Sequence, residues 1–165
     1  MKDARVLLVR HGDAVDGYGM ADELRWLTDK GRSRTRAVAQ KLEHEGIRFD
    51  RVLTSALVRA VQTAEILATC GAFEGPLEVY EPLGHMGRLT GLGALDGHHS
   101  GVWALVGHEP SMGLYASKLL GKRFPAFKKS AALLLHRRDG EHRFEWYLKP
   151  GKLELIRSLA DVGDD

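Results

Sequence analysis

The chain has 165 residues, of which 44% are hydrophobic and 28% are charged, a balance that excludes an intrinsically disordered or fibrous protein. The net charge of +2 is too small to indicate a protein that binds nucleic acid. Apolar runs are much shorter than the roughly 18 residues of a membrane span, so we expect a cytoplasmic protein. The length of the chain predicts one domain over residues 1–165.

The first elements predicted along the chain are a strand, a loop, a helix and a second strand. Residues 6–9 are a short apolar run, which is typical of a buried strand. Residues 12–27 are rich in Gly and Asp and predict a loop. The apolar spacing of residues 28–45 predicts a helix with Thr28 as its N-cap, and residues 51–54 predict the second strand.

The central part of the chain continues this alternation. A helix is predicted over residues 55–69, with Ser55 as its N-cap. Residues 77–80 predict a third, short strand, and the apolar run at residues 102–106 predicts a fourth. A helix over residues 111–120 follows, introduced by a proline and stopped by a glycine.

The last part of the chain predicts a hairpin and a terminal helix. Two apolar segments, residues 131–136 and 144–148, flank the turn residues 138–140, which is the pattern of a β-hairpin. A short helix is predicted over residues 153–159. Because strands alternate with helices along most of the chain, we predict a three-layer α/β/α sandwich around a mostly parallel central sheet.

Two histidines and two arginines follow the predicted strands near the point where each strand ends. Arg10 and His11 follow the first strand, and His108 follows the fourth. Arg59 lies in the first turn of the helix that follows the second strand. In parallel sheets the ligand binds outside the carboxyl ends of the strands. We therefore expect these four side chains to meet at one edge of the sheet.

These four side chains have the chemistry of a phosphate site with a nucleophile. Arg presents a planar fork of donors that matches phosphate oxygens, and it stays charged. Nearby guanidinium groups disfavour the imidazolium form of His11 and favour the neutral ring, whose free nitrogen can attack phosphorus. A backbone carbonyl in the turn at Gly12 is the expected partner of the other ring nitrogen. The residues are therefore consistent with nucleophilic histidine catalysis through a covalent intermediate.

Each of these residues also has a structural interpretation. Arg-His-Gly is a common tripeptide, although its position directly after a buried strand favours a functional role. Arg59 is also compatible with an ordinary solvated helix arginine. It shares a helix face with Gln62 and Thr63, one turn from the N-terminus, where a phosphate ligand is expected. His108 is also compatible with a structural histidine at the end of a strand.

Four motifs resemble the histidine phosphatase superfamily, which has the phosphoglycerate-mutase-like fold. Their order and spacing match the family from about residue 5 to residue 115. The motifs are Val9-Arg10-His11-Gly12, Leu27-Thr28 with Gly31, the segment from Thr54 to Ala64, and Val106-Gly107-His108-Glu109-Pro110. The resemblance implies that His11 accepts the phosphoryl group. It also implies three phosphate ligands, which are Arg10, Arg59 and His108.

Within that family the chain is most similar to the SixA-type phosphohistidine phosphatases. The similarity rests on the compact length and on the segments Lys129-Ser130-Ala131 and Trp146-Tyr147-Leu148-Lys149-Pro150. Ala56 departs from the Pro that the family usually has, and because Ala is a good helix former we expect little effect. The resemblance implies a phosphorylated protein as substrate.

The general acid of the family has no clear counterpart in this chain. Most phosphatases of the superfamily carry a Glu or Asp after the third strand, which protonates the leaving oxygen. Here His85 occupies that position, Glu81 lies four residues earlier and Asp13 lies beside the nucleophile, so three candidates stay open. A site without a dedicated carboxylic acid favours leaving groups such as imidazole, whose conjugate acid titrates near ~6.5, over alkoxides.

We therefore predict a metal-independent phosphatase that removes phosphate from phosphohistidine in a protein, such as a phosphotransfer domain. One alternative is a small-molecule phosphomonoesterase or mutase of the same fold, and another is a non-catalytic module that binds a phosphorylated ligand. A single cysteine, Cys70, and the lack of an HExxH pattern argue against a metal site. We expect no cofactor, no nucleic acid, no membrane partner, and a monomer or weak dimer.

Overall fold

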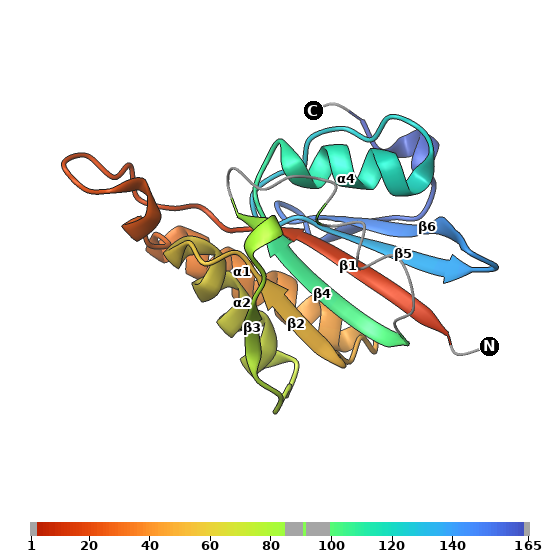
Figure 1. Cartoon of the computed structure of the whole chain (residues 1–165), viewed down its shortest axis with the longest axis horizontal. Coiled ribbons are helices and arrows are strands. Elements are labelled where there is room, and N and C mark those ends of the chain that lie inside the picture. The colour runs from red at the N-terminus through yellow and green to blue at the C-terminus, as the bar shows by residue number, and fades with distance from the viewer. Residues whose placement is uncertain (1–2, 85–90, 92–99, 164–165) are drawn as a thin grey trace.

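A central β-sheet runs through the molecule and carries helices on both of its faces (Figure 1). The computed structural model describes residues 3–84, 91 and 100–163. Within these residues the sheet has seven strands in the order β3-β2-β4-β1-β5-β6-β7. The strands are β1 (Ala4–Arg10), β2 (Arg51–Thr54), β3 (Leu77–Val79), β4 (Gly101–Gly107), β5 (Ala132–Arg138), β6 (Glu141–Lys149) and β7 (Glu154–Ile156). The α-helices are α1 (Asp29–His44), α2 (Val58–Cys70) and α4 (Ser111–Leu120).

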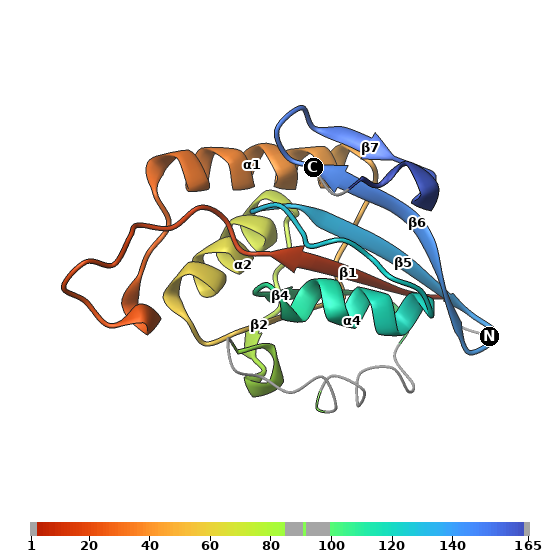
Figure 2. The ribbon, with the colours of Figure 1, turned by 90° about the horizontal axis from the view of Figure 1, so that it is seen from above.

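The pairing divides the sheet into a parallel part and an antiparallel part. Strands β3, β2, β4 and β1 pair in parallel, so their carboxyl ends lie at one edge. Strands β5, β6 and β7 each run antiparallel to their preceding neighbour in the sheet. The view from above shows α1 and α2 on one face and α4 on the other (Figure 2). The predicted α/β/α sandwich is confirmed.

Alternate residues of β1 supply the two cores. Val6 and Leu8 belong to the core that contains Tyr115 of α4. Leu7 and Val9 belong to the core that α1 and α2 cover. All four side chains are almost completely buried. A strand buried on both faces is expected to read as one apolar run, and this is why residues 6–9 show no polar alternation.

The predicted terminal helix over residues 153–159 is wrong. Residues Glu154–Ile156 form strand β7, which pairs antiparallel with β6, and a short 3-10 helix follows at Leu159–Asp161. Ile156 packs in one core and Leu155 packs against the other, so their side chains alternate as in a strand. Pairing with the open edge of β6 therefore outweighs the local preference of the segment for a helix.

The two predicted helix N-caps had different outcomes. Thr28 caps α1, because its hydroxyl accepts a hydrogen bond from the amide of Gly31. Ser55 does not cap α2, which begins only at Val58. The amide of Ser55 still donates to the carbonyl of Val106, so this residue continues the sheet instead of starting the helix.

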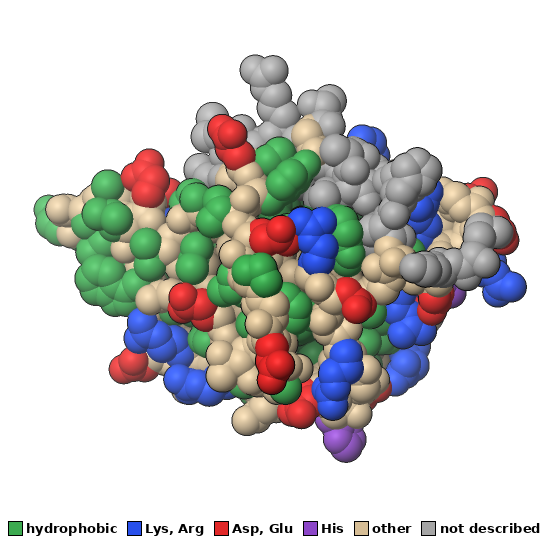
Figure 3. All heavy atoms as spheres, turned by 60° about the horizontal axis from the view of Figure 1, so that its bottom comes forward, with side chains coloured by type: hydrophobic (Ala, Val, Ile, Leu, Met, Phe, Trp, Pro, Cys, Tyr) green, Lys and Arg blue, Asp and Glu red, His purple; other side chains and the backbone are tan. Residues whose placement is uncertain are grey.

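The segment of residues 12–27 forms an arm that projects from the sheet edge (Figure 1). It contains a short 3-10 helix at Asp22–Leu24, which the prediction of a loop did not include. A bridge between Ala14 and Leu27 ties the base of the arm together. Figure 3 shows hydrophobic side chains gathered at this end of the molecule, and Tyr18, Leu24 and Trp26 are exposed there.

Among the described residues, no helix combines the length and the apolar character needed to cross a bilayer.

Candidate active site

The ends of β1 and β4 bring two histidines together. His11 follows β1 directly, and its amide donates to the carbonyl of Gly107, the last residue of β4. His108 is the next residue of that chain segment. The two rings lie with their centroids 4.9 Å apart and their planes inclined by 56°. The parallel pairing of β1 with β4 therefore places both histidines at one sheet edge, as predicted.

The backbone fixes which nitrogen of His11 is available. Its Nδ1 lies 2.7 Å from the carbonyl oxygen of Gly12, and the side chain is only 8% exposed. Because a carbonyl oxygen can only accept, Nδ1 carries the proton in the neutral ring and donates it to Gly12. The lone pair of the neutral ring then lies on Nε2. The expected contact with the Gly12 carbonyl is confirmed.

His11 is held in its neutral form. The pKa of His11 is lowered to about 4 from the ordinary value of 6.5, mainly by burial and also by the positive charges of Arg59, Arg10 and Lys129. The hydrogen bond to Gly12 acts in the opposite direction but does not outweigh the burial. At neutral pH nearly every molecule therefore carries an unprotonated Nε2.

Helix α2 fixes the backbone next to the nucleophile. The amide of Gly12 donates to the hydroxyl of Thr63, which lies 3.0 Å away, and that hydroxyl donates to the carbonyl of Arg59. A Cβ on residue 12 would lie 2.7 Å from the hydroxyl oxygen of Thr35, so this position requires glycine. The side chain of Gln62 accepts from the amide of Leu27 at the base of the arm.

Arg59 is buried and keeps one donor unused. Its side chain is 3% exposed, with Nη1 donating to the carbonyl of Asp22 and Nη2 to the carboxylate of the same residue, at 2.8 and 3.1 Å. Its Nε is buried without a hydrogen-bond partner among the described residues. Buried donors are normally satisfied, so this Nε–H lacks the acceptor that such a group usually has.

Arg10, the residue before His11, also keeps its Nε without a partner among the described residues. One Nη donates to the carbonyl of Phe127 at 2.7 Å, while its Nε is buried and lacks a partner within the described part of the chain. Both arginines lie close enough to His11 for their charges to lower its pKa, and each has a buried N–H without a partner among the described residues. A phosphoryl group would satisfy both of them with charge-assisted hydrogen bonds.

His108 is fixed by a residue at the end of β2. A hydrogen bond of 2.8 Å joins its Nε2 to the hydroxyl of Ser55, and both side chains are almost completely buried. Ser55, which the sequence suggested only as a helix cap, therefore positions a ring of the candidate site. The hydroxyl of Ser55 also accepts from the amide of Leu57.

The three candidate acids are not equivalent. Hydrogen bonds from Lys129 and Thr28 lower the pKa of Asp13, so this carboxyl is ionised at neutral pH and is a poor proton donor. The distances to its two oxygens are 2.7 Å from Lys129 and 2.9 Å from Thr28. Glu81 is exposed in a short 3-10 helix, Glu81–Leu83. His85 lies outside the described residues.

Sequence reasoning missed several residues that support this site. Asp22 holds Arg59 from the arm, and no local pattern marks it. One carboxylate oxygen of Glu109 accepts from the amides of Gly113 and Phe127, both at 3.1 Å. Phe127 in turn accepts from Arg10. Burial raises the pKa of Glu109. The position of Glu109 directly after His108 was the available signal.

No group of three or more His, Cys, Asp or Glu side chains within residues 3–84, 91 and 100–163 is arranged to hold a metal ion. The cations that face His11 instead come from Arg10, Arg59 and Lys129.

Comparisons with known proteins agree with this geometry. Phosphohistidine phosphatase SixA of Escherichia coli is 29% identical over 94% of this chain and 99% of its own length. The structure of the protein histidine phosphatase SixA complexed with tungstate superposes with a TM-score of 0.82, covering 91% of this chain and 99% of that one. A phosphoglycerate mutase of Bacillus anthracis, 13% identical, shares the fold with a TM-score of 0.68 over 99% of this chain and 96% of its own.

The family model described as histidine phosphatase superfamily, branch 1, matches residues 6–94, which is more than half of the chain. The matched region contains β1, α1, β2 and α2, and with them His11, Arg10 and Arg59. The resemblance stated from the sequence motifs is therefore confirmed: the chain belongs to the histidine phosphatase superfamily.

Proposed function

We propose that the protein is a phosphohistidine phosphatase that acts on a phosphorylated protein through a covalent phosphohistidine at His11. The observation that carries this proposal is the state of His11, a buried neutral ring whose Nδ1 donates to Gly12 and whose Nε2 keeps its lone pair. The likeness to SixA over nearly the whole chain supports the choice of substrate.

The proposed reaction has two displacements at phosphorus. In the first, Nε2 of His11 attacks the phosphorus atom, the bond between Nε2 and phosphorus forms, and the bond to the leaving group breaks. In the second, water attacks the same phosphorus, the bond to Nε2 breaks with its electron pair returning to the ring, and inorganic phosphate is released with the protons of the water. The unused N–H donors of Arg10 and Arg59 would bind the phosphoryl oxygens in both steps, together with His108.

A related structure supports a tetrahedral oxyanion as ligand. The SixA structure that superposes on this chain contains tungstate, a tetrahedral oxyanion like phosphate. In this chain the buried Nε–H groups of Arg10 and Arg59 lack a hydrogen-bond partner among the described residues. An oxyanion of this kind would satisfy them, which is the fit that the proposed mechanism requires.

The proposed leaving group rests on the state of Asp13, one of the three candidate acids. Asp13 is held ionised by Lys129 and Thr28, so it is not a donor for a strongly basic alkoxide. Phosphohistidine that carries a proton on its second ring nitrogen releases neutral imidazole, whose conjugate acid titrates near ~6.5, so this leaving group needs no proton from the enzyme. We therefore propose phosphohistidine as the substrate in preference to alkyl phosphates such as sugar phosphates.

Steady-state kinetics in EDTA test the proposal. Three substrates are compared: a phosphohistidine protein, an aryl phosphate and an alkyl phosphate. We expect kcat/KM to be highest for the first, measurable for the second and lowest for the third. His11→Ala should abolish all turnover, whereas His44→Ala, which removes an exposed imidazole from the end of α1, should not.

The covalent intermediate has a separate test. Rapid quenching into alkali, followed by mass spectrometry of the peptide that contains His11, should detect one phosphoryl group during turnover. A clear preference for the alkyl phosphate would favour a small-molecule phosphomonoesterase or mutase. Binding of vanadate without turnover of any substrate would favour a non-catalytic phosphate-binding module.

A further inference from the structure

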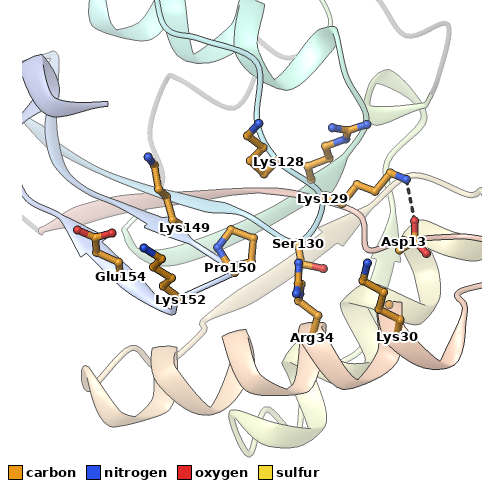
Figure 4. Close-up of a pocket in the computed structure, with 13 residues that line it drawn as sticks. Asp13, Lys30, Arg34, Lys128, Lys129, Ser130, Lys149, Pro150, Lys152 and Glu154 are labelled. Atoms are coloured by element: carbon orange, nitrogen blue, oxygen red, sulfur yellow. Dashed lines mark hydrogen bonds and ion pairs between the residues drawn. The ribbon is translucent and has the colours of Figure 1, made fainter. Parts of the chain in front are cut away.

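A groove with a volume of about 610 Å³ opens beside the candidate active site. Its lining includes Arg10 and Asp13, which lie one residue before and two residues after His11 in the chain. Figure 4 shows Lys30 and Arg34 rising from α1 toward the segment that carries Lys128 and Lys129. The groove then continues away from Asp13 toward the end of β6 and the turn before β7.

The charge of this groove differs sharply from that of the chain as a whole. Seven lining side chains are Lys or Arg and two are Asp or Glu, a net charge of +5. The whole chain has a net charge of only +2, so the rest of the sequence is net negative. The basic residues come from separate segments: Lys30 and Arg34, Lys128 and Lys129, and Lys149 and Lys152. The fold therefore concentrates positive charge on one side of the site.

The two acidic residues do not neutralise the groove. Asp13 is already bonded to Lys129 at 2.7 Å and to the hydroxyl of Thr28. Glu154 lies beside Lys149 and Lys152, at the end of the groove farther from Asp13 (Figure 4). The middle of the groove, between Arg34 and Lys128, is lined by cations without an acidic neighbour among its lining residues.

The groove and the phosphoryl site are continuous. Arg10 and Lys129 both line the groove, and the positive charges of both lower the pKa of His11. A ligand anchored at His11 would therefore extend its neighbouring atoms into the groove. The part of the groove formed by α1 lies close to the loop that carries the nucleophile. A Cβ added to Gly31 of α1 would lie only 2.1 Å from the carbonyl oxygen of Asp13.

We propose that this groove binds Asp and Glu side chains that flank the phosphorylated residue of a protein substrate. This inference rests on the proposed function. Lysine predominates among the cations, and lysine is a mobile point charge that pairs with carboxylates on a flexible segment. A site built for a compact polyphosphate would instead present several bidentate arginines or a nest of backbone amides. A cluster of like charges beside a site also speeds the encounter with an oppositely charged partner.

The test uses two phosphohistidine peptides that differ only in their flanks, one with Asp and Glu and the other with Asn and Gln. The groove variant combines Lys30→Gln, Arg34→Gln and Lys152→Gln, three exposed positions. We expect the wild type to prefer the acidic peptide by about tenfold in kcat/KM at low salt, the sum of three exposed ion pairs. The groove variant should lose this preference and keep its rate on an aryl phosphate.

A matched control has the same change in net charge at the opposite end of the sheet. It combines Arg48→Gln, Lys122→Gln and Arg138→Gln, which lie before β2, after α4 and at the end of β5. This variant should retain the preference for the acidic peptide. Equal rates on the two peptides in the wild type, or equal loss in the two variants, would overturn the inference.

A second readout separates this inference from the proposed function. Unphosphorylated acidic and neutral peptides are tested as inhibitors of aryl phosphate hydrolysis. If phosphohistidine peptides are not hydrolysed but the acidic peptide inhibits about tenfold better, the proposed substrate is wrong and the groove still binds acidic segments. If tripolyphosphate inhibits through the groove and the acidic peptide does not, the occupant is a small polyanion and the inference fails.

Discussion

The buried imidazole of His11 should make the stability of the fold depend on pH. In the unfolded chain this group titrates near its ordinary pKa of 6.5, whereas in the folded chain its pKa is lowered to about 4. Between these values the unfolded state binds a proton that the folded state does not, so the free energy of unfolding falls as the pH falls from 6.5 to 4. Between pH 7 and pH 5 the loss due to His11 alone is about 2 kcal/mol. This figure changes little for any folded pKa at or below 4.

Urea unfolding of the wild type and His11→Gln at pH 7 and pH 5 measures this effect. The variant has no imidazole at position 11, so its stability relative to the wild type should rise by about 2 kcal/mol on going to pH 5. The contributions of the other titrating groups to the free energy of unfolding cancel in the comparison. A phosphate-free buffer avoids stabilisation of the folded state by a bound oxyanion. His44→Gln controls for the loss of one histidine. A difference that stays constant within about 0.5 kcal/mol would refute the burial of a neutral His11.

Three further predictions concern the residues around the nucleophile. Asp22→Ala should lower kcat/KM for an aryl phosphate about tenfold, because Arg59 loses the carboxylate that orients its Nη2, while the carbonyl of residue 22 still accepts from Nη1; an unchanged rate in the same assay would contradict this role. Glu109→Ala should lower the free energy of unfolding by about 2 kcal/mol or more, because it leaves two backbone amides without an acceptor. Glu109→Gln keeps an acceptor oxygen, so urea unfolding should show a smaller loss for this variant. Asp13→Asn should change kcat less than about threefold in steady-state kinetics, because the loss of a true general acid costs about 100-fold or more.

The sequence predicted most elements of this fold because their signals are local. Val6 to Val9 read as a buried strand without any knowledge of the partners, and Thr28 capped its helix as expected. In the hairpin, Asp139 and Gly140 both have positive φ, at 53° and 84°, which agrees with the turn predicted there. The segment of residues 153–159 failed because its strand depends on a neighbour. Only the open edge of β6 makes Glu154–Ile156 a strand, and a local pattern does not contain that edge.

The same distinction applies to the candidate site. His11, Arg10 and His108 could be predicted because each follows a strand, and parallel pairing collects the strand ends. The groups that fix them depend on distant segments. Asp22 reaches Arg59 from 37 residues away, and Phe127 accepts from Arg10 across 117 residues. Ser55 was noticed only for its helix-capping potential, although its hydroxyl bonds to His108.

These distant contacts explain why the two arginines suit an oxyanion better than surface arginines would. Protein acceptors hold both outer nitrogens of Arg59, which bond to Asp22, and one outer nitrogen of Arg10, which bonds to the carbonyl of Phe127. Each Nε remains buried, without an acceptor in the described part of the chain. Because the side chains are already ordered, binding an oxyanion would cost little conformational entropy. Loss of Asp22 or of the Glu109 contact that supports Phe127 should therefore weaken phosphate binding without removing a single phosphate ligand.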